Sequence, residues 1–206
     1  MNDQNWKPLL ERLNRVMLKA EGFPREHCAQ EMSKGWCGWE PASDATIQEV
    51  EARLGLQLPP SYRSFLLCAN GWRPFGSFLL RLLPVQELAP LRTADPDFTS
   101  FIESPNGYRE VDATDAEYLD YETPEGITAI RARHYPDSIL ISQSWGDGEL
   151  LLLNPDVVFA GGEWETIFFG NWLPGNERYR SFRSYMEHHI GMEEMLDASR
   201  VSRDAS

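Results

Sequence analysis

The chain has 206 residues and a formal net charge of −13 at pH 7. Hydrophobic residues make up 42% of it, which is enough for a packed core and excludes global disorder. Its length predicts one ordinary domain with at most a modest extension. The excess of acids argues against binding to nucleic acid or to anionic membranes, and it favours basic partners.

The sequence carries no sign of export or membrane insertion. No apolar run approaches the roughly 20 residues that a membrane helix needs. The first residues lack a basic segment followed by an apolar one, so we expect no signal peptide. Three cysteines, Cys28, Cys37 and Cys68, do not suggest a disulfide framework. We therefore expect a cytoplasmic protein with reduced thiols.

The first third of the chain predicts three helices. Apolar residues recur at helical spacing over residues 6–20. A second helix is expected over 43–55, between a Ser-Asp cap and a glycine. A third is expected over 59–71, from a Pro-Pro start to an Asn-Gly stop. An irregular connector, residues 22–41, separates the first helix from the second.

The rest of the chain is expected to form strands and a closing helix. The turn residues Trp-Gly-Asp-Gly at 145–148 indicate a β-hairpin. Hairpin-linked strands with helices grouped apart predict an α+β fold with a largely antiparallel sheet flanked by helices. In chain order, the expected elements are strands over 77–83, 127–133, 138–142, 149–153 and 164–169, a helix over 177–190, and a frayed tail over 199–206.

Acidic residues are concentrated between Asp95 and Glu125, where ten acids accompany one base, Arg109. This region lacks strong periodicity, which predicts a long loop or insertion with short elements. Several acids are spaced two residues apart, and in an extended chain each pair would point to one side, about 6.6 Å apart. Such a row suits the lysines and arginines of a basic protein and would steer association. The alternative is a solvated loop that binds nothing.

No catalytic or metal-binding constellation assembles from the sequence. His27, Cys28 and Cys37 offer three ligands at a spacing unlike that of zinc sites. The glycines at 145–148 lie between two expected strands, unlike a phosphate-binding loop. Asp95-Pro96-Asp97 resembles a metal-nucleotide element, but so short a match often occurs by chance. We expect no catalysis, no cofactor and no metal; a glycan- or nucleotide-acting enzyme is the least favoured alternative.

One stretch combines a helix stop, a proline start and an Asn-Gly stop at fixed offsets. Its residues are Ile47, Val50, Glu51, Leu54, Gly55, Leu58, Pro59, Tyr62, Phe65, Leu66, Asn70 and Gly71. This stretch resembles the opening of the SUKH superfamily. The resemblance continues at 145–148 and around Phe182 and Tyr185, and it covers roughly residues 39–190.

This resemblance divides the chain into three parts. Residues 1–38 form an N-terminal helical extension and connector, residues 39–190 a SUKH-like α+β domain, and residues 191–206 a C-terminal tail. The superfamily includes the yeast cell-wall-assembly regulator and many bacterial immunity proteins that neutralise toxins. The resemblance therefore implies a binding function without catalysis.

The leading expectation is an immunity-type protein that binds a cognate toxin domain, such as a basic nuclease, and occludes its active site. The alternative is a regulatory adaptor similar to the cell-wall-assembly regulator. The predicted partner-binding residues are Asp112, Asp115, Glu117, Asp120 and Glu122 for electrostatic contact, with Tyr118 and Tyr121 as anchors.

Overall fold

The structure is a computed structural model that describes residues 5–19, 28–104, 114–123, 128–146, 148–173 and 175–204, with only the backbone described for 200–204. The α-helices are α1 (Lys7–Lys19), α2 (Ala29–Ser33), α3 (Asp44–Leu54), α4 (Pro60–Leu66), α5 (Leu91–Ala94), α6 (Pro96–Ile102), α7 (Asp115–Tyr118) and α9 (Phe182–Asp204). The strands are β1 (Leu79–Leu82), β2 (Ala89–Pro90), β3 (Ile139–Leu140), β4 (Ser142–Ser144), β5 (Leu150–Val158), β6 (Trp164–Phe169) and β7 (Asn176–Tyr179). Short 3₁₀ turns lie at Val85–Glu87, Ala132–His134 and Ala160–Gly162.

The strands form two antiparallel sheets in the part of the chain that the structure describes. One has two strands, β1 and β4, and the other has five in the order β2-β3-β5-β6-β7. The two strands of the expected hairpin are paired, because β3 lies antiparallel to β5 with Ile139 opposite Leu153. Between them in sequence, β4 pairs with β1 instead. These sheets and their flanking helices confirm the α+β fold class.

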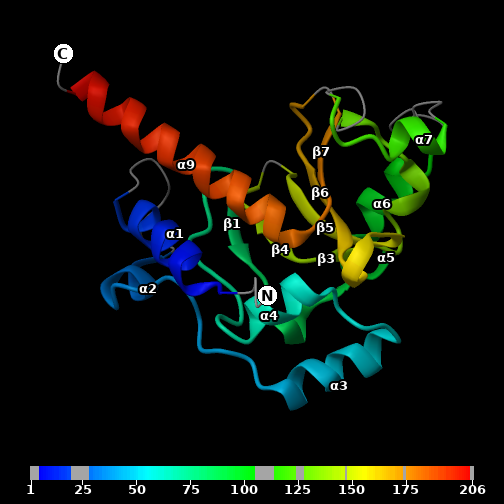
Figure 1. Cartoon of the computed structure of the whole chain (residues 1–206), viewed down its shortest axis with the longest axis horizontal. Helices are drawn as coiled ribbons and strands as arrows, with labels where there is room; N and C mark the ends of the chain where they lie inside the picture. Colours follow the sequence, from blue (N-terminus) through cyan, green and yellow to red (C-terminus); the bar gives the residue numbers. More distant parts are fainter. Residues whose placement is uncertain are drawn as a thin grey trace.

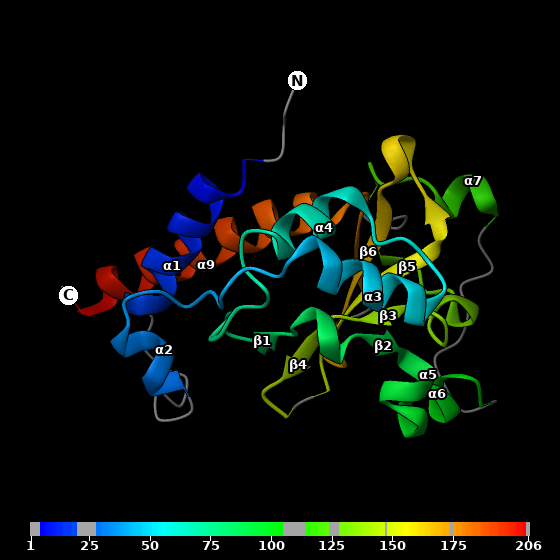
Figure 2. The ribbon, with the colours of Figure 1, turned by 90° about the horizontal axis from the view of Figure 1, so that it is seen from below.

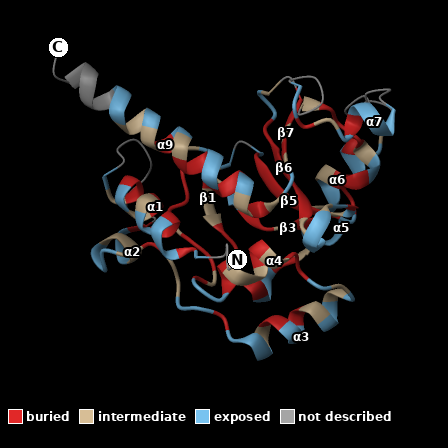
Figure 3. Ribbon diagram, viewed as in Figure 1, coloured by how far each residue is buried: buried red, intermediate tan, exposed pale blue. Residues whose placement is uncertain are grey.

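The five-stranded sheet is covered on both faces. α9 lies over one face, and α5 and α6 lie over the other (Figures 1 and 2). Along β6, Trp164 and Phe168 join one core, whereas Ile167 and Phe169 join the second. Every residue of β6 is buried, including the polar residues Glu165 and Thr166, because both faces of the sheet are covered. Figure 3 shows the burial of the central strands against the exposed outer face of α3.

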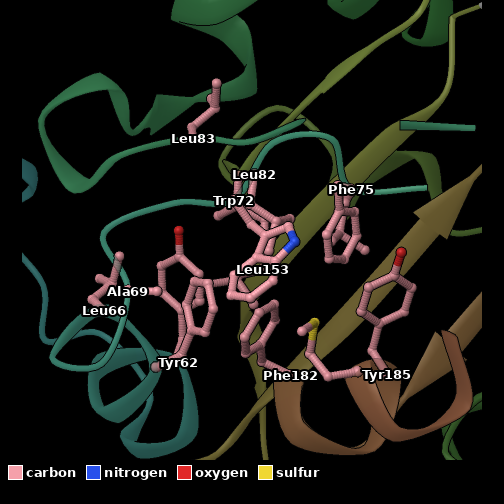
Figure 4. Packing of buried hydrophobic residues seen from close by; sticks show 14 of the residues in the cluster. Tyr62, Leu66, Ala69, Trp72, Phe75, Leu82, Leu83, Leu153, Phe182 and Tyr185 are labelled. Atoms are coloured by element: carbon pink, nitrogen blue, oxygen red, sulfur yellow. The ribbon is translucent and has the colours of Figure 1, made fainter. Parts of the chain in front are cut away.

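The main core is built where α4 and α9 meet the sheet. Tyr62 and Phe182 contact each other edge to face, with ring centroids 4.9 Å apart, beside Leu153 and Trp72 (Figure 4). Trp6, just ahead of α1, packs on the same group, 5.7 Å from the ring of Phe182. The N-terminal helix is therefore part of this core, although the sequence presents it as an extension.

The acid-rich region contributes a second core. Phe98 of α6 packs edge to face on Phe169 with ring centroids 5.2 Å apart. Leu91 and Ile102 are buried in the same cluster. The expectation of an insertion with short elements holds for the described part of the region, and these elements cover the second face of the sheet.

The residues that carry the family resemblance serve folding. Gly55 ends α3 in the left-handed conformation, φ 71°, which glycine adopts without a steric penalty. Glu51 accepts a hydrogen bond from the backbone N–H of Leu58 at 2.9 Å, which fixes the link to α4. Asn70 accepts one from Val85 at 2.8 Å. At Gly71, φ 106°, a Cβ would approach the carbonyl oxygen of Leu82 to 2.9 Å.

The predicted closing helix over 177–190 is wrong at its start. Residues Asn176–Tyr179 form β7, which pairs with the edge of β6, and α9 begins at Phe182. Ser181 marks the true start, because its hydroxyl accepts from the N–H of Ser184 at 3.1 Å. The tail is also different from the prediction, since α9 continues to Asp204.

The strand expected over 127–133 is absent from the described residues there. Ala129, Ile130 and Arg131 are all buried in succession, so the two-residue alternation of a half-buried strand is missing. The carbonyl of Ala129 accepts instead from the side chain of Asn176 at 3.2 Å. The expected irregular connector contains the short helix α2. None of the helices that the structure describes has the length and apolarity required to cross a membrane.

Candidate functional site

The predicted acidic site falls on a short stretch that runs past α7. We call residues 114–123 the acidic segment. Asp112 lies outside the described residues. Asp115, Glu117 and Glu122 are exposed, and Asp120 is partly buried. Asp115–Glu117 belongs to a helical turn, so the extended row of acids expected from the two-residue spacing is not formed there.

Local hydrogen bonds hold the start of the acidic segment. The hydroxyl of Thr114 accepts from the N–H of Glu117 at 3.3 Å, and the Glu117 carboxylate accepts from the N–H of Thr114 at 2.8 Å. This reciprocal capping box satisfies donors that a helix start otherwise leaves unpaired. The side-chain and backbone hydrogen bonds from Thr114 lower the pKa of Glu117, so this carboxylate is ionised at neutral pH.

Similar contacts order the end of the segment. Asp120 accepts from the N–H of Glu122 at 2.8 Å and from the hydroxyl of Thr123 at 3.1 Å. The hydrogen bond from Glu122 is the main reason that the pKa of Asp120 is lowered. Glu122 pairs with Arg180 at 3.1 Å, with both side chains more than half exposed. Glu117 and Asp120 thus hold fixed hydrogen bonds, and Asp115, Glu117 and Glu122 face solvent.

The two predicted anchors are placed differently from the expectation. Tyr118 is 1% exposed and Tyr121 is 9% exposed, so neither ring is free for a partner in this structure. Both tyrosine hydroxyls donate a hydrogen bond to the carboxylate of Glu165. The distance from the Tyr118 oxygen to the carboxylate oxygen is 3.1 Å. The tyrosines point inward and tie the acidic segment to the sheet.

A buried ion pair receives them. Glu165 of β6 and Arg178 of β7 have fully buried side chains, joined at 2.6 Å. The side-chain amide of Asn154 donates to Glu165 at 2.7 Å. The Arg178 guanidinium lies 3.7 Å from the ring centre of Tyr118, and it also donates to the backbone carbonyl oxygen of Tyr118. Buried charges persist where such additional hydrogen bonds satisfy them. We call Glu165, Arg178, Asn154, Tyr118 and Tyr121 the buried network.

The sequence contains one signal that could have revealed this network. Glu165 interrupts an apolar strand, and a charged residue in a buried strand requires a partner. Its partners Tyr118 and Arg178 lie 47 and 13 residues away in sequence. Helix or strand periodicity does not identify such pairs.

A hollow of about 520 Å³ adjoins the acidic segment. Its lining includes Tyr121 and Glu122 from the segment, Glu177 and Arg180 from the β7 region, and His188 from α9. We call it the β7 hollow. The β7 hollow is a concave surface next to the exposed acids, and a concave surface can receive a protruding group of a ligand or partner.

The residues that suggested other chemistry have structural roles. Asp95 caps α6, where its carboxylate accepts from the N–H of Phe98 at 2.9 Å. Trp145, in the turn at 145–148, donates to the carbonyl of Gly76 at 3.0 Å. Within the described ranges, no three His, Cys, Asp or Glu side chains gather in a way that could hold a metal ion.

Comparison with known families agrees with this fold. The model of the SMI1/KNR4 family (SUKH-1) matches residues 41–188. The chain belongs to this family. The SUKH-1 match covers the span from just before α3 into α9, and it confirms the resemblance found in the opening motif. A search of curated proteins finds no match to this SUKH-1 chain.

The SUKH-1 region includes both the acidic segment and the buried network. α1, which completes the main core, lies outside the matched span. The family assignment therefore covers the candidate site, while the helix that supports α9 is an addition of this chain to the matched domain.

Proposed function

We propose that this SUKH-1 protein is an immunity-type binding protein. It binds a cognate toxin domain, such as a basic nuclease, and blocks the active site of that domain by occlusion. It has no catalytic activity of its own and acts in the cytoplasm of the producing cell. The observation that carries the proposal is the acidic segment, in which Asp115, Glu117 and Glu122 face solvent while the buried network holds the backbone of the segment on the sheet.

The physical support for this role is pre-organisation. A flexible acidic loop would lose conformational entropy on binding, whereas an ordered one loses less. Glu117 and Asp120 already have fixed hydrogen bonds, and Glu122 stands beside the β7 hollow. Acids in fixed positions give a complementary basic surface a defined register and a faster encounter.

The first test is affinity capture from the lysate of the native cell, washed at low and then at high salt. The proposal expects one dominant basic partner whose retention falls as salt rises. Purified partner and SUKH-1 chain should then form a stoichiometric complex in which the toxin activity is lost. Several moderate partners with no loss of any activity would favour the regulatory adaptor instead.

The second test removes three of the four carboxylate charges of the acidic segment while keeping hydrogen-bonding side chains at those positions. In the triple variant Glu117→Gln, Asp120→Asn and Glu122→Gln, the association rate with the captured partner should fall about tenfold at low salt, and its salt dependence should flatten. Stopped-flow or surface-based kinetics measure both quantities. The unfolding midpoint checks that the fold is retained.

A matched control removes the same charge elsewhere. Glu11, Glu40 and Glu49 are exposed and lie away from α7, on or beside α1 and α3. Their replacement by Gln should change the association rate much less than the first triple variant does. Equal effects of the two triple variants would show that only net charge matters and would refute the acidic segment as the contact surface.

A further inference from the structure

A second hollow lies beside the β7 hollow and has a different character. It has a volume of about 270 Å³, and Glu177 and His188 line both hollows. We call it the aromatic hollow and define it by Phe78, Phe168, Trp172, Glu177, Met192 and Glu193. Through these shared residues the aromatic hollow adjoins the β7 hollow, which is lined by Tyr121 and Glu122 of the acidic segment.

Three apolar side chains of the aromatic hollow are unusually exposed. Phe78 is 37%, Trp172 50% and Met192 40% exposed, whereas most large apolar residues of this chain are buried. The rings of Phe78 and Trp172 lie 4.8 Å apart. Trp, Phe and Met gathered at a surface are typical of interface anchors.

Other contacts fix these groups in place before any partner arrives. The indole N–H of Trp172 donates to Glu149 at 3.3 Å. Glu193 is 3% exposed and accepts from the backbone N–H of Ser77 at 2.8 Å. Glu177 accepts from the hydroxyl of Tyr179 at 2.9 Å. The hollow is therefore pre-organised, with acids held beside aromatic faces.

The charges of the lining select the occupant. Two carboxylates, Glu177 and Glu193, line the aromatic hollow, and no lysine or arginine is among its described lining residues. The other titratable groups that line the aromatic hollow are Tyr185, His188 and His189. Burial lowers the pKa of His189, so its imidazole ring is neutral at neutral pH. A purely apolar occupant would desolvate Glu177, which is partly exposed, without compensating its charge.

We propose that the aromatic hollow receives a long cationic side chain, arginine or lysine, from a basic protein partner. The aliphatic stem lies against Met192 and Phe78, the cation lies over the face of Trp172, and Glu177 neutralises its charge. The volume is below the roughly 300–1,000 Å³ of small-molecule sites, which favours one side chain over a free cofactor. This inference deepens the proposed function and rests on its basic partner.

The test uses the full chain and a defined probe, so that it does not depend on capturing the partner. The probe is the peptide acetyl-Gly-Leu-Arg-Leu-Gly-amide, with a matched peptide in which citrulline, uncharged and of the same shape, replaces arginine. Binding is followed by the indole N–H signal of Trp172 in two-dimensional NMR, assigned with Trp172→Phe. The arginine peptide should move this signal saturably, and citrulline should weaken binding at least about fivefold.

Two variants and their controls complete the experiment. Trp172→Ala and Glu177→Gln should each weaken binding of the arginine peptide by about fivefold or more. Because Trp172→Ala lacks the indole signal, binding to this variant is followed by the methyl signal of Met192. Phe101→Ala removes another exposed aromatic ring and Glu49→Gln another exposed acid, and both should leave binding unchanged. Equal binding of the citrulline peptide, or an unmoved Trp172 signal, would overturn the proposal.

The outcome is separable from that of the proposed function. Peptide binding in the aromatic hollow without any captured partner would refute toxin neutralisation and leave the cation site standing. A captured, neutralised toxin whose affinity is unaffected by Trp172→Ala would refute the cation site and leave the immunity function standing.

Discussion

At the scale of single residues, the buried network is the feature on which the acidic segment depends. Glu165 and Arg178 are both fully buried and satisfy each other, and the tyrosines attach to them. Removing one partner of such a pair leaves an uncompensated charge in a medium that solvates it poorly. Removing both removes the two charges together, although the hydroxyls of Tyr118 and Tyr121 and the amide of Asn154 then lose their acceptor.

We therefore predict strong coupling between these two residues. Glu165→Leu or Arg178→Leu alone should lower the free energy of unfolding by about 3–5 kcal/mol. The double variant should lose clearly less than the sum of the two single losses. Urea unfolding of all four proteins gives the double-mutant cycle. Additive losses would contradict the idea that the charges matter mainly to each other.

His189 predicts how stability depends on pH. Its ring N–H donates to the carbonyl of Phe75 at 2.9 Å, and burial lowers its pKa below the ordinary value of 6.5, against the opposing effect of Glu193. Below pH 6.5 the unfolded chain therefore binds more protons at this position than the folded chain. The free energy of unfolding should fall as pH falls through this window.

The variant His189→Gln isolates this contribution, because the amide N–H₂ can keep the hydrogen bond to Phe75. Between about pH 7 and 5.5, the wild type should lose stability more steeply than the variant, as measured by urea unfolding at each pH. His188, which is exposed, provides the control: His188→Gln should keep the steep slope. Identical slopes for the wild type and His189→Gln would refute the assignment.

At the scale of elements, α1 is part of the fold despite its place outside the matched domain. Its inner residues Leu10, Leu13 and Met17 are buried in the main core, and Arg12 pairs with Glu194 of α9 at 2.6 Å. The expected boundary at residue 38 therefore separates segments that share one core.

This arrangement makes α1 necessary for stability. Leu13→Ala should lower the free energy of unfolding by about 2–5 kcal/mol, because Leu13 is fully buried and its loss leaves a cavity. Glu11→Ala, on the exposed side of the same helix, should change it by less than about 0.5 kcal/mol. Thermal or urea unfolding distinguishes the two variants. Equal stability of both would show that α1 packs only loosely on α9.

At the scale of the whole molecule, local signals predicted the fold better than the site. Helix periodicity and caps predicted α1 and α3, and the hairpin turn predicted the pairing of β3 with β5. The error at β7 arose because Asn176–Tyr179 becomes a strand only by pairing with β6, which no local pattern encodes.

The site followed the same rule. Exposure of Asp115, Glu117 and Glu122 could be predicted, since charged residues in a turn-rich region face water. The inward orientation of Tyr118 and Tyr121 could not, because it depends on Glu165 and Arg178 from distant strands. The exposed aromatic pair Phe78 and Trp172 was missed for the same reason, being joined only by the fold.

The buried network has one more consequence, for how this protein can evolve. The tyrosines that fix the acidic segment and the acids that face solvent belong to the same ten residues, yet they point in opposite directions. Substitutions among the outward-facing acids that keep the hydrogen bonds of Glu117 and Asp120 leave the attachments of Tyr118 and Tyr121 intact. A lineage can therefore revise which surface it recognises, one charge at a time, while the scaffold beneath stays folded.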